Sequence, residues 1–259
     1  MEKQTVGHIA VSGIIYRAAN PEEIFIDMKD ATYPHVVWRG CLCLIGGNWI
    51  GKEARYDTSP LMTFAREVGE ELSLDKRVQS TAELVELSVH TTPINYVVKG
   101  IDRKATREDC ESLEYVEQAI IHSARSFGDY ISTIPREVFL RGDTTSRQTA
   151  IVSLFCVFDV GLNEEMWAML ARLGRDFGNL SCESESRILS VDDIIEKNII
   201  AMAGYDYILQ DFFECKGVMR QRVLPMDPAV KVRRASVYPR RSYKSYLRHY
   251  FVTKKPEGW

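Results

Sequence analysis

Short runs of apolar and β-branched residues recur along the chain with the period of a β-strand. The first run covers residues 6–16, and residues 23–28 alternate again after an Asn-Pro turn signal. The run at 150–160 is the most apolar in the chain, so it predicts a central strand that is buried on both faces. The other predicted strands cover residues 36–45, 82–89, 96–101 and 186–190.

Apolar residues with a helical period lie between and after these strands. Ser59 supplies a capping hydroxyl and Pro60 suits a first helical turn, so a helix is predicted over residues 60–72. Its apolar stripe consists of Leu61, Ala65, Val68 and Leu72. Further helices are predicted at 109–127, at 163–173, from residue 191 and at 199–213.

Mixed strands with helices between and after them indicate an α+β fold, a sandwich of helices around a mixed β-sheet. We expect one domain over residues 1–215 and a C-terminal extension over residues 216–259. Residues 102–147 are interpreted as a helical insertion, in which the part from residue 129 onward is polar and rich in turn residues.

Charge divides the chain in the same way. Residues 216–259 contain twelve Lys and Arg against two acids, whereas residues 1–215 contain 21 basic and 34 acidic residues. Such a split indicates either an anionic partner or a tail that lies on its own acidic body.

The amino-acid composition indicates the class of protein and the compartment in which we expect it. Hydrophobic residues at 45% and charged residues at 27% are ordinary for a globular protein. No run approaches the roughly 18 apolar residues of a membrane span, and the N-terminus is predicted to be a strand and not a signal peptide. The six cysteines form no CxxC pair and lie near no His cluster, so we expect a reducing cytoplasm rather than a disulfide framework or a zinc site.

The helix at 60–72 carries the candidate chemistry. Glu67, Glu70 and Glu71 fall on one face of it, away from the apolar stripe. Three neighbouring carboxylates repel one another unless a hard divalent cation such as Mg²⁺ or Mn²⁺ neutralises them. The plain alternative is a solvated acidic face, in which Arg66 and Glu70 form an ordinary surface pair.

The residues around this helix resemble the Nudix box, G-x5-E-x7-R-E-U-x-E-E-x-G-U, where U is a bulky aliphatic residue. The matching positions here are Gly47-x5-Glu53-x12-Arg66-Glu67-Val68-x-Glu70-Glu71-x-Ser73-Leu74. The second half departs from the motif only at Ser73, and the first half needs five extra residues in a loop, where an insertion costs little closure entropy. The order of strands and helices is also similar to that family over residues 5–215.

The resemblance implies hydrolysis of a diphosphate bond in a nucleoside diphosphate derivative with Mg²⁺ or Mn²⁺. It implies that Glu70 and Glu71 hold metal, that Glu67 shares in metal binding or orients the attacking water, and that Arg66 holds the glutamates in place. The Gly47 carbonyl and Glu53 are further expected metal ligands.

Other roles follow less directly from the same resemblance. The general base in such enzymes is often a carboxylate from a later segment, and Glu183 and Glu185 are placed for it in the sequence. Gly46 and Gly47 allow close approach of a ligand, and the ring of Trp49 is a candidate for stacking on a base. Lone aromatics next to strands are more often core residues.

The tail leaves several readings open. In residues 241–251, aromatic and basic residues form two separate helical stripes, which suits RNA binding and therefore an RNA 5′-end or cap pyrophosphohydrolase. The same aromatic stripe also suits docking on the acidic body or on a partner subunit of a homodimer. A third alternative is a Nudix-like regulatory module that binds nucleotides without cleaving them.

Overall fold

The fold was analysed in a computed structural model. The structure describes residues 5–6, 8–29, 33, 38–49, 57–72, 74, 105–135, 150–177, 180, 184–219, 222–236 and 251–252. The predicted strands at 82–89 and 96–101, the aromatic and basic stripes of 241–251, and Glu53, Ser73 and Glu183 lie outside these residues.

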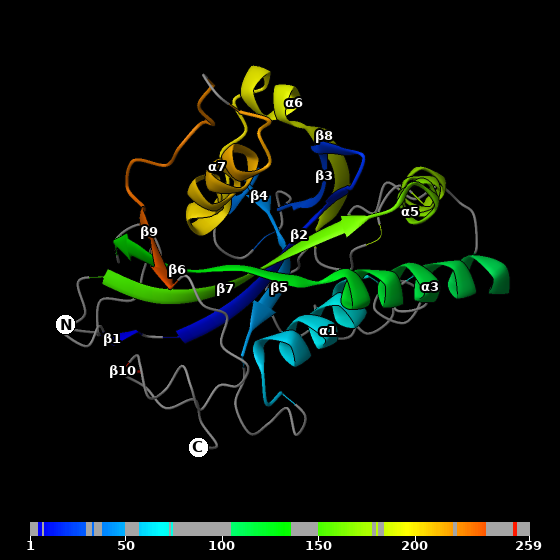
Figure 1. The fold of residues 1–259 in the computed structure, drawn as a ribbon, viewed down its shortest axis with the longest axis horizontal. Coiled ribbons are helices and arrows are strands. Elements are labelled where there is room, and N and C mark those ends of the chain that lie inside the picture. Colours follow the sequence, from blue (N-terminus) through cyan, green and yellow to red (C-terminus); the bar gives the residue numbers. More distant parts are fainter. Residues whose placement is uncertain are drawn as a thin grey trace, which may run out of the picture.

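A mixed sheet of eight strands forms the centre of the molecule (Figure 1). Its main path runs in the order β4-β3-β2-β7-β6-β9, while β5 pairs with β2 and β8 pairs with β3. The strands are β2 (His8–Arg17), β3 (Asn20–Met28), β4 (Leu42–Cys43), β5 (Ile45–Asn48), β6 (Arg125–Pro135), β7 (Ala150–Leu162), β8 (Glu185–Ser190) and β9 (Lys231–Ser236). The pair of β2 and β7 is parallel and the other pairs are antiparallel. Two short strands, β1 (Thr5–Val6) and β10 (Phe251–Val252), pair separately.

Helices cover both faces of this sheet. On one face lie α1 (Pro60–Glu71), α3 (Arg107–Ser123) and α5 (Glu164–Phe177), and on the other lie α6 (Val191–Glu196) and α7 (Tyr205–Cys215), preceded by the short 3₁₀ helix η3 (Met202–Gly204) (Figure 1). The predicted α+β class with a mixed sheet is therefore confirmed.

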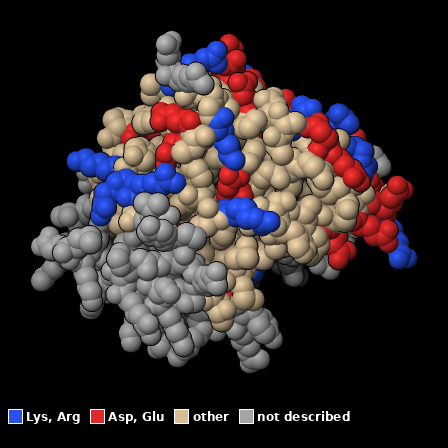
Figure 2. Space-filling model, viewed as in Figure 1, with Lys and Arg blue, Asp and Glu red and all other residues tan. Residues whose placement is uncertain are grey.

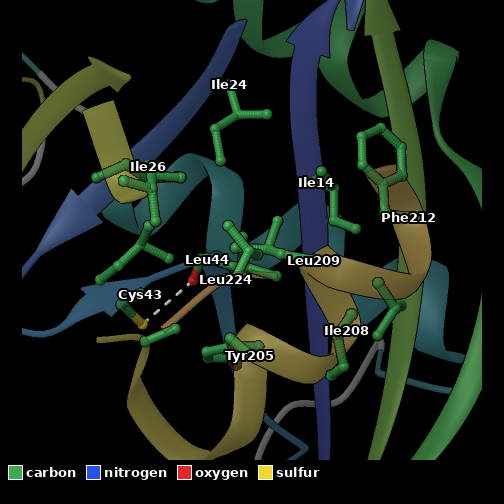
Figure 3. Packing of buried hydrophobic residues seen from close by; sticks show 14 of the residues in the cluster. Ile14, Ile24, Ile26, Cys43, Leu44, Tyr205, Ile208, Leu209, Phe212 and Leu224 are labelled. Carbon is green, nitrogen blue, oxygen red and sulfur yellow. Dashed lines mark hydrogen bonds between the residues drawn. The ribbon is translucent and has the colours of Figure 1, made fainter. Parts of the chain in front are cut away.

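The central strands bury both of their faces, as the apolar run at 150–160 predicts. Along β7, Leu154 and Cys156 belong to the core beneath α1, α3 and α5, whereas Phe155 and Val157 belong to the core beneath α7. Figure 3 shows the second core, where Ile208, Leu209 and Phe212 of α7 lie over the sheet strands. Because side chains alternate across a strand, one sheet serves two separate cores.

The sheet divides along one edge of β2. The first half of β2 pairs with β5, at Ala10–Gly13, and its second half pairs with β3, at Ile15–Arg17. Beyond this point β3 leaves β2 and pairs with β4 and β8 on its two sides. The division brings the ends of β3, β4 and β5 together next to α1.

Three expectations need correction. The predicted strand at 36–45 is interrupted, because residues 38–40 form a turn and only β4 and β5 are extended. The predicted helix at 109–127 ends at Ser123, because the residues from Arg125 onward belong to β6. The segment from residue 129 is not a polar, turn-rich region in its described part, because β6 pairs with β7 along its length.

The described part of the extension adds to the same sheet. β9 pairs with β6, and its Lys231, Arg233 and Arg234 are exposed. Figure 2 shows a group of Lys and Arg side chains on the side where β9 lies, and Asp and Glu side chains on the side where α3 lies. Among the described residues, no helix is both long and apolar enough to cross a membrane.

A first prediction concerns the contact between α1 and β2. A Cβ atom built on Gly13 would lie 2.3 Å from Cζ of Phe64, so Gly13→Ala forces the helix or the ring to move. We expect a loss of about 1–3 kcal/mol in the free energy of unfolding, measured by urea denaturation.

The matched control is Gly174→Ala in α5, where nothing lies within 4 Å of the added atom. It should raise the stability by about 0.5–1 kcal/mol, because glycine is unfavourable within a helix. Equal effects of the two substitutions would contradict the close packing of α1 on β2.

Candidate active site

A cavity of about 410 Å³ opens where the sheet divides. Such a volume lies within the range of small-molecule sites, which are about 300–1,000 Å³. Residues of α1, of the sheet, and of η3 and the start of α7 line it. The whole set of lining residues consists of Ala10, Lys29, Tyr33, Trp38, Cys43, Gly46, Gly47, Asn48, Glu67, Glu71, Ile134, Ser153, Phe155, Met202, Ala203 and Tyr205.

The helix α1 is held at this cavity by its first turn and by its buried apolar residues. Of the predicted apolar stripe, Val68 and Leu72 are buried, whereas Leu61 is 41% exposed and Phe64 is buried in its place. Ser59 is the N-cap, and its side chain accepts a hydrogen bond from the backbone N–H of Met62, as the sequence predicts. Phe64 and Val68 are fully buried, and the ring of Phe64 stacks on Phe158 of β7 at 5.2 Å between centroids. The acidic face of the helix is thereby turned toward the edge of β5.

Glu67 lies directly over the backbone of β5. A Cβ atom on Gly47 would come within 2.3 to 2.5 Å of three atoms of the Glu67 carboxylate, so any other residue there would displace this carboxylate. The preceding Gly46 has φ +146°, and a Cβ atom on it would lie 2.2 Å from the carbonyl oxygen of Val11. The two glycines therefore allow carboxylates of α1 to reach the cavity across β5.

Glu71 is the most deeply placed carboxylate of the helix. It is 7% exposed, and its Oε2 accepts a hydrogen bond of 2.9 Å from the N–H of Gly46. Burial raises the pKa of Glu71 well above its usual range, and the charge of Asp27 raises it further, whereas Lys29 and the Gly46 N–H act in the opposite direction. A positive charge in the cavity would favour the ionised carboxylate.

Arg66 ties the helix to the segments on both sides of it. Its Nε and Nη2 donate to Oδ2 of Asp57, at 3.2 and 3.1 Å, and Nη2 also donates to the carbonyl oxygen of Asn48 at the end of β5. The same guanidinium lies 2.8 Å from Oε1 of Glu67 and 2.8 Å from Oε2 of Glu70. It thus contacts two of the three box glutamates and helps to fix their side chains.

The structure separates the three predicted metal carboxylates. Glu67 and Glu71 line the cavity, whereas Glu70 is half exposed and pairs with Arg66 outside the cavity wall. Among the described residues, no group of three or more His, Cys, Asp or Glu side chains could hold a metal ion. Two carboxylates are still a suitable set for Mg²⁺, which keeps several waters and takes further oxygen ligands from substrate phosphates.

The other predicted site residues are placed elsewhere. The indole N–H of Trp49 donates to the carbonyl oxygen of Asp57, its ring packs on the core beneath α1, and it does not line the cavity. Glu185 lies at the start of β8, where it is half exposed and pairs with Arg187 at 2.8 Å. Neither side chain comes together with Glu67 and Glu71.

Several cavity residues were missed from the sequence. Lys29 follows β3 and is 5% exposed, and Asp27 of β3 is 1% exposed and accepts a hydrogen bond from the hydroxyl of Ser184. Tyr205 donates to or accepts from the buried hydroxyl of Ser12, at 2.6 Å. The available signal in the sequence was the presence of charged residues in the apolar run at 23–29. Such residues are almost never fully buried unless they are paired, so their burial in a strand points to a site.

No protein-family model matches this sequence, and a search of curated proteins found no match to it. The assignment of a function therefore depends on the residues and on the geometry of this cavity.

A second prediction concerns the Arg66 cluster. Arg66→Met removes the cation that faces the Asp57 carboxylate, whose side chain is only 3% exposed. Because a buried charge then loses its partner, we expect the free energy of unfolding to fall by about 1–3 kcal/mol in chemical denaturation.

The comparison variant is Glu70→Gln, which alters the half-exposed side of the same guanidinium. It should change the stability by less than about 0.5 kcal/mol, because exposed ion pairs contribute little. A larger loss for Glu70→Gln than for Arg66→Met would show that Asp57 is not the main partner.

Proposed function

We propose that this protein is a Mg²⁺- or Mn²⁺-dependent hydrolase of the Nudix type, which cleaves a diphosphate bond in a nucleoside diphosphate derivative. The observation that carries the proposal is the meeting of three box residues, Gly47, Glu67 and Glu71, in the wall of one cavity. The box is spread over 28 positions of the sequence, from Gly47 to Leu74, and a chance motif would not bring its carboxylates to a cavity.

Glu67 and Glu71 are the residues that would hold the metal, and a backbone carbonyl of the adjacent β5 would add to them. When bound, such a metal neutralises phosphate oxygens and lowers the pKa of a coordinated water. Glu53 remains a proposed additional ligand, and Glu70, by its pairing with Arg66, is proposed to support Glu67 indirectly.

The chain's own groups would then orient the reactants. Water attacks one phosphorus atom, the bond from that phosphorus to the bridging oxygen breaks, and the bridging oxygen leaves with the second phosphoryl group. Arg66 keeps Glu67 in place through their contact at 2.8 Å. The proton of the attacking water needs a base. Glu183, which lies outside the described residues, remains the proposed candidate, whereas Glu185 pairs with Arg187 away from the cavity and is not proposed further.

The remainder of the cavity suits the part of the substrate beyond the phosphates. Trp38, Phe155, Met202 and Tyr205 form an apolar and aromatic part of its wall. Such a surface favours a flat ring or another weakly polar group, because burying it releases water. A nucleoside linked through a diphosphate has both chemical parts.

An RNA 5′ end or cap is a second candidate substrate. The observation that favours it is the exposed pair of Lys231 and Arg233, which share one face of β9 and add basic charge beside the strand that contributes Ile134 to the cavity. Such a pair can neutralise backbone phosphates. A protein that binds nucleotides without cleaving them is a third candidate, and substrate turnover decides between these functions.

A third prediction tests the carboxylates. With a panel of nucleotide sugars, dinucleoside polyphosphates and capped RNA, the wild-type protein should release phosphate-containing products only when Mg²⁺ or Mn²⁺ is added. Glu67→Gln and Glu71→Gln should each lower kcat/KM by at least about 100-fold, because each removes a charge that holds the metal.

Glu196→Gln at the exposed end of α6 is the matched control and should retain full turnover. Circular dichroism of each variant verifies that folding is retained. Undiminished turnover in both cavity variants would refute the proposed function, and nucleotide binding without turnover in the wild type would favour the binding module.

A further inference from the structure

Lys29 is a buried lysine held firmly in the cavity wall. It directly follows β3, its N–H donates to the carbonyl oxygen of Cys41 at 3.0 Å, and its own carbonyl oxygen accepts from Gly40 at 2.6 Å. These two bonds fix its backbone against the turn that leads into β4. The whole residue is only 5% exposed, and yet it lines the cavity that holds Glu67 and Glu71.

The ammonium group of Lys29 has no direct partner in the part of the chain that the structure describes. It forms no hydrogen bond and no ion pair there, and its Nζ lies over the ring of Tyr33, 5.1 Å from the centroid. An ammonium group carries three N–H donors and no acceptor. A ring face supports the charge but cannot satisfy these donors.

The surroundings keep this lysine charged. Burial by itself lowers the pKa of Lys29, but Cys43, Glu71 and Asp27 outweigh it, so that the pKa lies above its ordinary value. A charged group in a nearly closed wall needs acceptors from the cavity, since a buried donor without one is costly. Among the described residues of the wall, Lys29 is the single cation.

We propose that Lys29 binds an anionic phosphate oxygen of the substrate. The inference rests on the proposed function and adds a substrate-binding residue that is not part of the box. A diphosphate that enters the cavity meets two carboxylates, and the cation that it meets before any metal is Lys29. An ammonium group on a flexible stem suits this role, because it binds phosphate as a point charge without a required plane.

The competing interpretation is a counter-ion that merely balances Glu71 and Asp27. In that case Lys29 contributes to stability and has no contact with the ligand. Binding of a phosphate anion in the absence of metal separates the two interpretations.

A fourth prediction uses inorganic pyrophosphate as the probe. The full-length protein is titrated with pyrophosphate in EDTA by isothermal calorimetry, for the wild type, Lys29→Met, Lys29→Arg and the control Lys197→Met. Lys197 is an exposed residue after α6 that pairs with Asp193, so its loss should leave binding unchanged. Lys29→Met should raise Kd by about 10- to 100-fold, and Lys29→Arg should restore most of the affinity.

A second readout needs no variant. In protein labelled with ¹⁵N-lysine, the side-chain ¹⁵N signal of Lys29 should shift during the same titration, and that of Lys197 should not. This measurement decides the question if Lys29→Met does not fold. Wild-type affinity in Lys29→Met, an unchanged Lys29 signal, or no pyrophosphate binding by the wild type would each overturn the proposal.

The outcome is independent of whether the protein is a hydrolase. Lys29-dependent binding of pyrophosphate without turnover of any substrate would support the anion site and refute the proposed function. Turnover with an unchanged KM and unchanged pyrophosphate affinity in Lys29→Met would refute the anion site alone.

Discussion

The close packing of α1 against β2 and β5 is the constraint on which the candidate site depends. At two positions there is no room for a Cβ atom: the ring of Phe64 occupies that space at Gly13, and the carboxylate of Glu67 occupies it at Gly47. Apolar burial holds the helix on the sheet, and the two glycines let it come close enough for Glu67 and Glu71 to reach the cavity. The same residues therefore determine both the packing of the helix and the position of its carboxylates.

Charge balance is the second part of the arrangement. Glu71 and Asp27 are nearly inaccessible to solvent, and carboxylates in such places are stable only with donors or cations nearby. On the outer side of the helix, Arg66 pairs with Asp57, Glu67 and Glu70. On the inner side, the Gly46 N–H and the charge of Lys29 stabilise the ionised form of Glu71. The described wall of the cavity contains two carboxylates, Glu67 and Glu71, and one cation, Lys29, and this set of oxygen ligands is the reason to propose a divalent cation there.

Local signals in the sequence predict the helix well and the cavity only in part. The Ser59 cap acts within the first turn, and the observed α1 ends one residue before the predicted end. The predicted apolar stripe is correct at Val68 and Leu72 and wrong at Leu61, because the ring of Phe64 takes the buried position. The charged residues Asp27 and Lys29 could not be placed, because β3 meets β4 and β8 through pairings that are distant in the sequence. β6 was missed because its polar residues are satisfied by tertiary contacts, such as the hydrogen bond of 2.8 Å from Ser132 to the carbonyl oxygen of Ala203. Glu70 and Glu71 point in directions about 100° apart around the helix, so that Glu71 is buried at β5 whereas Glu70 is half exposed and pairs with Arg66.

The central claim is that Glu67 and Glu71 hold a divalent cation in the cavity beside β5. A crystal soaked in Mn²⁺ and measured at a wavelength where manganese scatters anomalously tests it most directly. The account predicts an anomalous peak within bonding distance of carboxylate oxygens of Glu67 and Glu71, at about 2.0–2.3 Å as for hard cations and oxygen ligands. A crystal with manganese bound only elsewhere, or with none bound at millimolar Mn²⁺, would contradict it.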